Sequence, residues 1–525
     1  MKYFITFLLS ISSLWLCSQE PTKFDITYCR PQWTLSPLKL YIEGCVTTYF
    51  KPIDVNTKTI DFDLVTELVV DSVLQRNQKL SYTHNNDKLV ITLLEELPAN
   101  TLDSISIYYK GEPRSQAGFG AFQNDLKNGS LWTISEAFNA RCWWPCRQNL
   151  YDKIDSIDIF VTCDTTYIVA TNGKLIDDVQ KGSCHTMHYK SHHPMSYYTI
   201  GVAVGKYDVY TYRTTLLNNQ LLTITDYVYK NNTLYDESGR KLTKKAIKVL
   251  GDYFGIYPFA DEKYGQAQIS WSGGIEHQTV TFLSIFSQTL INHELAHQWF
   301  GNYVTCASWR DIWINEAFAS FCELLIIESD PFSFVFEKVS KYKQALEAKG
   351  TIYINDVDNE DAIFDYNTTY QKGAYTLIML QNEIGEQNFR KGCQLILSKY
   401  ANGFVTIEDA QKCFEEAANT NLKYFFDAWI YHKGYPIYDI TYKKLSRNRI
   451  NIKINQKNSE NDSTFYEMHL PFEIQTTSGK KEITLHQTMP QQEFTISVDD
   501  TITNLLFNKR LDILCEDKIT EIKTE

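Results

Sequence analysis

The stretch HELAH at residues 293–297 decides the local fold of this chain, because it places two histidines four residues apart. On an α-helix, side chains at positions i and i+4 leave the same face about one turn apart. His293 and His297 can therefore bind one tetrahedral Zn²⁺, while Glu294 lies beside the open position of the metal. Glu316, further along the chain, supplies a third ligand. Three protein ligands leave one position for water, which is the pattern of a catalytic rather than a structural zinc site.

The residues around this motif predict two helices that bring the ligands to one point. Apolar residues flank the histidines at helical spacing, and Gly301 followed by Asn302 predicts the end of the first helix. A second, amphipathic helix is predicted around Glu316. Glu323 returns to nearly the same face two turns later, where it either orients a ligand histidine or is an ordinary surface carboxylate. The alternative for the whole motif is a buried helix whose histidines only form hydrogen bonds.

Length, composition and charge limit the class of protein. The chain has 525 residues, which is too many for one core, so three compact units are expected. A content of 43% hydrophobic and 14% aromatic residues is that of a folded globular protein. The 51 basic and 63 acidic side chains give a net charge of −12, and no basic stripe is present. We therefore expect no nucleic-acid partner, and the acidic field favours cationic ligands such as free peptide N-termini.

The N-terminus carries an apolar run, FITFLLSISSLWL, at residues 4–16. This run is shorter than a membrane-spanning helix, so we predict a secretory signal peptide over residues 1–17. A lipid on Cys17 is an alternative, although Leu16 before it fits that motif poorly. No other stretch is apolar enough to span a bilayer. We therefore predict an exported protein (secreted, periplasmic or lipid-tethered) with no integral membrane span in the mature chain.

Twelve cysteines suit an oxidising compartment, which agrees with export. Cys163 and Cys184 flank one predicted hairpin, and Cys29 and Cys45 flank another. Both pairs are candidates for disulfide bonds.

Hydrophobic periodicity divides the chain into three folded parts with an α+β organisation. Residues 20–210 alternate with a period of two between turn residues, which predicts an N-terminal antiparallel β-domain. Helical patterns dominate residues 211–434, and short strands return over residues 435–515 as a small β-sandwich, followed by a tail at 516–525. The predicted strands include 105–109, 157–161, 197–204, 450–454 and 494–498, and the predicted helices include 241–253, 370–384, 386–399 and 407–419.

Two adjacent glycines, Gly273 and Gly274, precede Glu276 shortly before the zinc motif. Glycine lets the backbone approach a ligand closely. A strand at this place could pair with an extended peptide and point Glu276 at the end of that peptide. The alternative is a glycine turn with a solvated glutamate.

Three segments together are similar to the aminopeptidase N family of gluzincin metallopeptidases, which includes the leukotriene-hydrolase branch. They are GGIEH from Gly273, HELAHQWFGN from His293, and the pattern W-x-D-x-W-I-N-E from Trp309 to Glu316. The resemblance is specific over residues 264–323 and weaker elsewhere. It implies a saddle-shaped N-terminal β-domain, a thermolysin-like, mainly helical catalytic domain and a small C-terminal β-sandwich. We therefore expect a short form of the family, without the large helical fourth domain of many members.

The resemblance also implies a role for each matching residue. His293, His297 and Glu316 correspond to the ligands of one zinc ion per chain, and Glu294 corresponds to the general base. Glu276 corresponds to the glutamate that holds the α-ammonium of the substrate, with Gly273 and Gly274 beside it. Tyr370, followed by Lys-Gly-Ala at 372–374, corresponds to the tyrosine that stabilises the oxyanion, although Tyr366 and Tyr375 lie nearby. Glu136 stands where many members have a glutamine near the same amine.

The chain departs from the family pattern at four positions. Ile275 and His277 replace a methionine and an asparagine, Ala317 replaces a glycine, and Glu136 adds a charge beside Glu276. The function implied is a zinc-dependent aminopeptidase that acts on peptides with free N-termini. Two alternatives are a thermolysin-like endopeptidase and a non-catalytic peptide-binding protein on the same fold.

Overall fold

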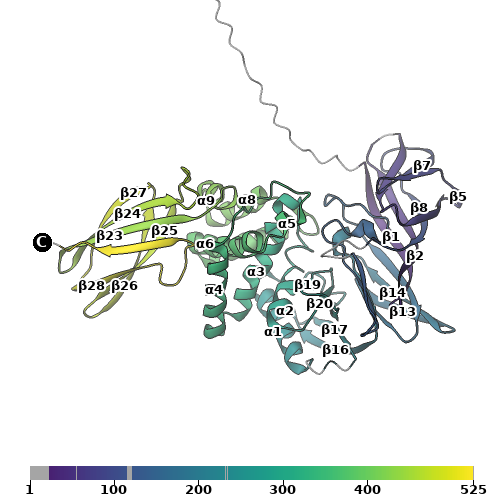
Figure 1. The fold of residues 1–525 in the computed structure, drawn as a ribbon, viewed down its shortest axis with the longest axis horizontal. Coiled ribbons are helices and arrows are strands. Elements are labelled where there is room, and N and C mark those ends of the chain that lie inside the picture. The colour runs from purple at the N-terminus through teal and green to yellow at the C-terminus, as the bar shows by residue number, and fades with distance from the viewer. Residues whose placement is uncertain (1–22, 55, 115–120, 231, 233–234, 524–525) are drawn as a thin grey trace, which may run out of the picture.

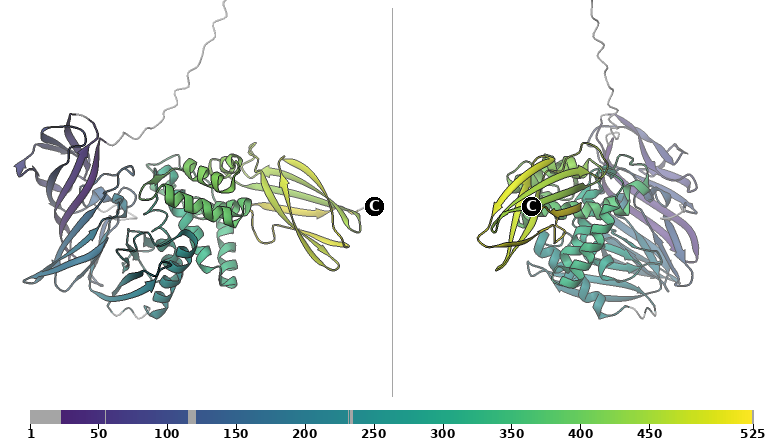
Figure 2. Two further views of the ribbon diagram at one scale, coloured as in Figure 1. Left: turned by 180° about the vertical axis from the view of Figure 1, so that it is seen from behind. Right: turned by 60° about the vertical axis from the view of Figure 1, so that its left-hand side comes forward.

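The computed structural model describes residues 23–54, 56–114, 121–230, 232 and 235–523. The predicted signal peptide and Cys17 lie outside these residues. The molecule is elongated, with an N-terminal β-region at one end, a mainly helical region in the middle and β-sheets of the C-terminal part at the other end (Figure 1). The views in Figure 2 agree with this order. This arrangement confirms the predicted α+β multidomain fold.

The N-terminal region is built on an eight-stranded sheet in the order β13-β14-β11-β1-β2-β8-β4-β5. Two smaller sheets, β12-β15-β10-β9 and β3-β7-β6, complete it. All these strands pair antiparallel except β1 and β11, which run parallel. The strands are β1 Phe24–Ser36, β2 Lys39–Pro52, β3 Thr57–Asp63, β4 Val69–Gln75, β5 Gln78–Lys79, β6 Tyr82–Asn85, β7 Lys88–Leu97, β8 Asp103–Gly111, β9 Phe122–Asp125, β10 Ser130–Thr133, β11 Ile157–Asp164, β12 Ile168–Thr171, β13 Lys174–Lys181, β14 Cys184–Ser191 and β15 Val202–Gly205.

One predicted strand of this region is wrong in its first half. Residues 197–204 were expected to be one strand, but Tyr197–Thr199 form a short 3₁₀ helix before β15. The hydroxyl of Tyr198 donates a hydrogen bond to the carbonyl of Gly301, at 2.9 Å. This contact with the turn after the zinc motif draws the backbone away from strand geometry.

The middle region combines a five-stranded sheet, β16-β17-β18-β20-β19, with nine helices of the described chain. Its strands are β16 Tyr207–Thr215, β17 Leu221–Tyr229, β18 Tyr264–Gln268, β19 Gly274–Ile275, β20 Val280–Leu283 and the short pair β21 Thr305–Cys306 with β22 Phe404–Val405. Its helices are α1 Glu237–Phe254, α2 Gln288–Ala296, α3 Trp313–Ile327, α4 Pro331–Leu346, α5 Glu360–Ile363, α6 Gly373–Ile384, α7 Glu386–Lys399, α8 Ile407–Ala418 and α9 Lys423–Ile430.

The helix α3 differs from its predicted amphipathic character. Every residue of α3 except Leu325 is buried, because the helix packs against neighbours on all sides. Such a helix holds its polar residues in fixed positions, since a buried polar side chain needs a specific partner. Glu316 and Glu323 are two of these buried polar residues.

The C-terminal part contains two facing sheets, β27-β24-β23-β29 and β26-β25-β28. Residues 516–525 were predicted as a tail, but Glu516–Glu521 form β29, which pairs in parallel with β23. The charged sequence hid this strand because it lies at the edge of its sheet and has little to bury. The other strands are β23 Pro436–Ser446, β24 Arg449–Asn458, β25 Met468–Thr476, β26 Gly479–Gln487, β27 Gln491–Ser497 and β28 Ile502–Phe507.

Both predicted disulfides are wrong, and the described cysteines are all reduced. In the pairing of β11 with β14, Cys184 lies opposite Asp164 and Cys163 lies opposite His185. Neighbouring residues of a strand point to opposite faces, so the two thiols lie on different faces of the sheet. The same holds for Cys29, which lies opposite Thr48 rather than near Cys45.

Among the described helices, none is both long and apolar enough to cross a membrane.

Candidate metal centre

Two helices bring the three predicted metal ligands together. The Ser287 side chain accepts a hydrogen bond from the backbone N–H of Leu290 and so begins α2, which carries His293. The regular helix ends at Ala296, before the predicted stop at Gly301, yet His297 keeps right-handed helical angles. The two imidazoles therefore still project in the same direction, towards Glu316 in the first turn of α3.

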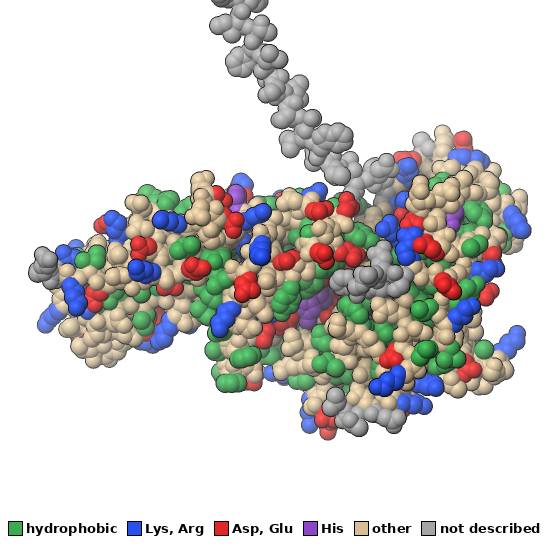
Figure 3. Space-filling view, viewed as in Figure 1, with side chains coloured by type: hydrophobic (Ala, Val, Ile, Leu, Met, Phe, Trp, Pro, Cys, Tyr) green, Lys and Arg blue, Asp and Glu red, His purple; other side chains and the backbone are tan. Residues whose placement is uncertain are grey.

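The spacing of the ligand atoms fits a tetrahedral zinc ion. The Glu316 Oε2 atom lies 3.3 Å from His293 Nε2 and 3.4 Å from His297 Nε2. Ligand atoms about 2.1 Å from a tetrahedral zinc are separated by about 3.4 Å, which matches both distances. Acidic and histidine side chains are visible together in a hollow near the middle of the molecular face, where α2, α3 and β19 meet (Figure 3).

Both ligand histidines are oriented through their second ring nitrogen. His293 Nδ1 lies 2.7 Å from Glu323 Oε1, and His297 Nδ1 lies 3.1 Å from the carbonyl oxygen of Phe300. An acceptor at Nδ1 leaves Nε2 with the lone pair that a metal needs. Glu323 is buried, so the alternative of a surface carboxylate is wrong. Lys341 on α4 was not predicted from the sequence, and its ammonium donates to Glu323 Oε2 at 2.8 Å.

Glu294 lies in the same buried cluster, against the backbone of β19. A Cβ atom added to Gly274 would lie 2.4 Å from Glu294 Oε1, so only glycine leaves room for this carboxylate. Burial raises the pKa of Glu294 to about 8, although both histidines act in the opposite direction. Burial also opposes ionisation of Glu316, but His297 and His293 outweigh it and lower the pKa of that carboxyl to about 2.

A second group of carboxylates adjoins the ligands. Glu276 follows β19, Glu136 comes from the loop after β10, and one oxygen of each lies within 4.8 Å of a Glu316 oxygen. Glu276 is only 3% exposed, so the alternative of a solvated glutamate is wrong. The Oε1 atoms of Glu136 and Glu276 are buried without a hydrogen-bond partner among the described residues. Burial raises the pKa of both carboxyls, and their mutual repulsion raises that of Glu136 further.

Tyr370 lies beside the ligands on a π-helix, Tyr366–Lys372, that precedes α6. The sequence predicted a helix here but not its wider π geometry, which is often found at functional sites. The ring of Tyr370 stacks near that of His293, with 5.9 Å between centroids. Burial and the surrounding carboxylates raise the pKa of Tyr370, so its hydroxyl stays protonated. Tyr375 points away, because its hydroxyl donates to the carbonyl of Leu511.

The two helices carry an H-E-x-x-H zinc-binding pattern with a glutamate as the third ligand. Residues 284–429 match the model of the Peptidase family M1 domain.

The chain is also similar to curated proteins and to solved structures. The chain is 25% identical over 459 residues to Tricorn protease-interacting factor F2 of Thermoplasma acidophilum, covering 82% of this chain and 56% of that protein. It is 26% identical over 386 residues to Aminopeptidase M1-B of Oryza sativa subsp. japonica, covering 68% of this chain and 41% of that protein. The chain thus spans about half the length of the curated relatives. The M1 zinc metallopeptidase from Deinococcus radiodurans has a similar fold, with a TM-score of 0.69 and 22% identity over 78% of this chain and 93% of that one.

Proposed function

We propose that this protein is a zinc-dependent aminopeptidase, which releases single residues from the N-terminus of peptides. The observation that carries the proposal is the position of two further carboxylates, the partly buried Glu136 and the buried Glu276, next to the three-ligand cluster. A metal site alone indicates hydrolysis but does not indicate which bond of the substrate is cleaved. Unpaired carboxylate oxygens next to it favour a substrate that brings a positive charge close to the bond to be cleaved. Several curated relatives are named aminopeptidases, which supports the proposal.

In the proposed reaction, His293, His297 and Glu316 hold the zinc ion. When bound, zinc lowers the pKa of a water molecule and polarises the scissile carbonyl. Glu294 accepts the proton of the attacking water and passes it to the departing amine, a transfer worth about 10²–10⁴ in rate. Its raised pKa of about 8 suits a group that both accepts and donates a proton near neutral pH. Tyr370 donates a hydrogen bond to the developing oxyanion, worth about 3–4 kcal/mol.

Glu136 and Glu276 hold the N-terminal ammonium. Two buried carboxyls in close contact share a proton, so the pair carries about one negative charge when no substrate is bound. That charge matches one ammonium, and a charge-assisted hydrogen bond contributes about 1.5–3 kcal/mol. Because these carboxylates adjoin the ligands, a bound ammonium presents the first peptide bond to the zinc site.

The experiment compares free and N-acetylated substrates. The full-length protein should hydrolyse aminoacyl-arylamides, lose this activity with a chelator and regain it with Zn²⁺. Glu276→Gln should lower kcat/KM for free-amine substrates by about 10-fold or more while zinc content stays constant. The matched control is Glu482→Gln, an exposed glutamate of the C-terminal sheets, which should have no effect.

Two outcomes contradict the proposal. Cleavage of N-acetylated peptides at internal bonds, as fast as free ones, would make the protein an endopeptidase. Peptide binding without turnover in the zinc-loaded protein would make it a binding protein.

We also propose that the protein is exported. This proposal depends on the apolar segment at residues 4–16 alone, because the described cysteines form no disulfide. Fractionation of the source cell with N-terminal sequencing of the mature chain tests it. An intact N-terminus in the cytosolic fraction would contradict it.

A further inference from the structure

A second cluster of metal-binding side chains lies outside the candidate centre and shares no residue with it. Two of its members follow β14, and the other two lie in the loop between α1 and β18. We call it the histidine–carboxylate cluster, and it consists of His192, His193, Asp261 and Glu262. The cluster therefore joins the N-terminal β-region to the middle region of the chain.

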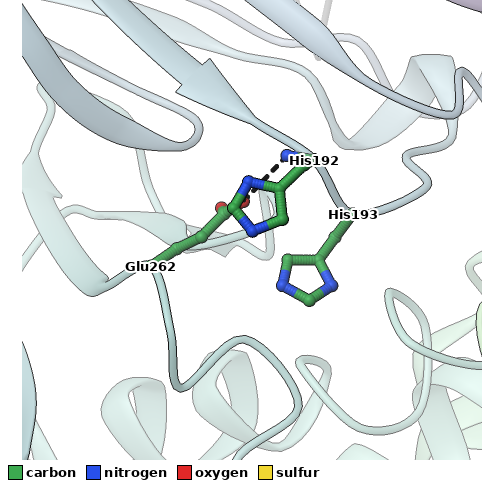
Figure 4. Close-up of side chains that lie close together, drawn as sticks. All are labelled: His192, His193 and Glu262. Atoms are coloured by element: carbon green, nitrogen blue, oxygen red, sulfur yellow. Dashed lines mark hydrogen bonds and ion pairs between the residues drawn. The ribbon is translucent and has the colours of Figure 1, made fainter.

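The two imidazoles face one carboxylate. Asp261 Oδ2 lies 2.8 Å from His192 Nε2, and Asp261 Oδ1 lies 2.8 Å from His193 Nε2. The two rings are stacked, with 5.2 Å between their centroids and 26° between their planes. Figure 4 shows both rings leaving adjacent positions of the backbone, with the Glu262 carboxylate next to the ring of His192. His192 and Asp261 are more than half exposed, so a metal ion can reach the cluster from solvent.

Glu262 distinguishes this cluster from an ordinary surface ion pair. Its side chain is only 1% exposed, and its Oε1 atom accepts the backbone N–H of His192 at 3.0 Å. Its Oε2 atom is buried and has no hydrogen-bond partner among the described residues. The neighbouring Lys263 does not satisfy it, because the ammonium donates instead to the carbonyl of Thr171 at 2.6 Å. A buried carboxylate oxygen without a partner is costly, which points to a cation as its missing partner.

The spacing also suits a metal ion. One nitrogen from each histidine and one oxygen of Glu262 all lie within 4.8 Å of one another. Ligand atoms of a tetrahedral zinc are separated by about 3.4 Å, so each pair of atoms would need to approach by at most about 1.4 Å. Two imidazoles with carboxylate oxygens suit zinc, cobalt or nickel, whereas calcium and magnesium prefer oxygen ligands alone.

We propose that the histidine–carboxylate cluster is a second metal site, which binds Zn²⁺ or a similar divalent transition-metal ion and ties the N-terminal region to the middle region. His192 and His193 supply nitrogen ligands and Glu262 supplies a carboxylate oxygen, while Asp261 lies against the Nε2 atoms of both histidines. The bound ion also fixes the loop that contains Tyr257, whose hydroxyl contacts the carbonyl of Lys263 and Gln298 Oε1. The site shares no residue with the candidate metal centre, so turnover does not require it.

The experiment counts zinc equivalents in the full-length protein. The chain is stripped with a chelator, titrated with Zn²⁺ against a chromophoric competitor, and analysed for bound metal. We expect two equivalents for the wild type and one for the double variant His192→Gln, His193→Gln. Glu262→Gln should keep the second equivalent but weaken it about 10–100-fold. Zn²⁺ should raise the melting temperature of the wild type more than that of the double variant, while their metal-free melting temperatures agree.

The matched control is the double variant His469→Gln, His486→Gln, another stacked pair of partly exposed histidines with carboxylate partners. It should keep both equivalents. Two equivalents in the His192 and His193 double variant overturn the second site, and so does a single wild-type equivalent that this double variant keeps. Glu316→Gln separates this inference from the proposed function. This variant should lose the zinc equivalent of the candidate metal centre and keep that of the histidine–carboxylate cluster. If Glu316→Gln keeps both, the candidate centre fails and the histidine–carboxylate cluster stands.

Discussion

At the scale of single residues, Glu294 has a role that can be separated from metal binding. Glu294 lies close to Glu276 and His297, but it is not one of the three proposed zinc ligands. Those are His293, His297 and Glu316, whose ligand atoms have the spacing that zinc requires. Glu294→Gln keeps the shape and removes the base, so kcat should fall by about 10²–10⁴ while zinc content stays at the wild-type value. Arylamide kinetics with metal analysis measure both quantities. Unchanged kcat would assign the base to another group.

Gly274 limits the position of the same carboxylate. Because an added Cβ would lie 2.4 Å from Glu294 Oε1, Gly274→Ala should displace the carboxylate. A displacement of about 1 Å commonly costs about 10²-fold in rate, so kcat should fall strongly with zinc retained. The control is Gly251→Ala in α1, where an added Cβ meets nothing within 4 Å. Wild-type kcat in Gly274→Ala would show that Glu294 has room to move without loss.

The sequence predicts the ligands well because their geometry is local. The spacing of His293 and His297 follows from the helix alone, and Glu316 stands in the next helix. Lys341 and its contact with Glu323 could not be predicted in the same way. On sequence alone, a lysine on a helix with exposed neighbours is expected at the surface, and only the packing of α4 against α3 makes it a buried partner.

At the scale of elements, the crossing of α3 and α6 depends on a glycine. An added Cβ at Gly373 would lie 2.7 Å from the Ala317 Cβ atom and 3.0 Å from Trp313 Cδ1. Gly373→Ala should therefore destabilise the protein by about 1–3 kcal/mol through overpacking, measured by urea unfolding. Ala317→Gly in the same chain should restore part of this loss, since it removes the nearest atom. Additive effects of the two substitutions would contradict a direct contact.

Elements with clear periodicity match their predicted bounds, and elements set by tertiary contacts do not. The predicted helix 386–399 coincides with α7, and 407–419 differs from α8 by one residue. The predicted helix 370–384 begins instead as the π-helix that carries Tyr370. A single extra residue in a helical turn leaves no periodic signal, so only the structure reveals it.

At the scale of the whole molecule, long-range pairing limits what the sequence predicts. The order of folded parts follows from patterning, but β29 joins β23 across most of the C-terminal part, and a charged strand gives little hydrophobic signal. The domain boundaries at residues 210 and 434 stay predictions. Contacts between distant parts, such as that of Tyr198 with Gly301, leave no pattern along the sequence.

Lys153 also contacts a residue far away in the sequence, Asn302, and its burial makes the free energy of unfolding depend on pH. Its ammonium donates to the carbonyl of Asn302 at 2.8 Å, and Asn302 Nδ2 in turn donates to the carbonyl of Glu276 at 2.8 Å. Burial lowers the pKa of Lys153 from 10.5 to about 7. Between these values the unfolded chain binds the proton and the folded chain releases it. The free energy of unfolding should therefore rise with pH from about 7 to about 10, by at most about 1.4 kcal/mol per pH unit for this group.

Lys153→Met removes this titration, so its free energy of unfolding should rise less steeply than that of the wild type between pH 7 and pH 9. Lys263 is the internal reference, because burial also lowers its pKa to about 7 and it stays in both proteins. Urea unfolding at pH 7, 8 and 9 measures the two slopes. Equal slopes would mean that Lys153 keeps its proton in the folded protein throughout this range. Asn302, whose side chain donates to the carbonyl of Glu276, would then bind a charged Lys153 ammonium at every pH in this range.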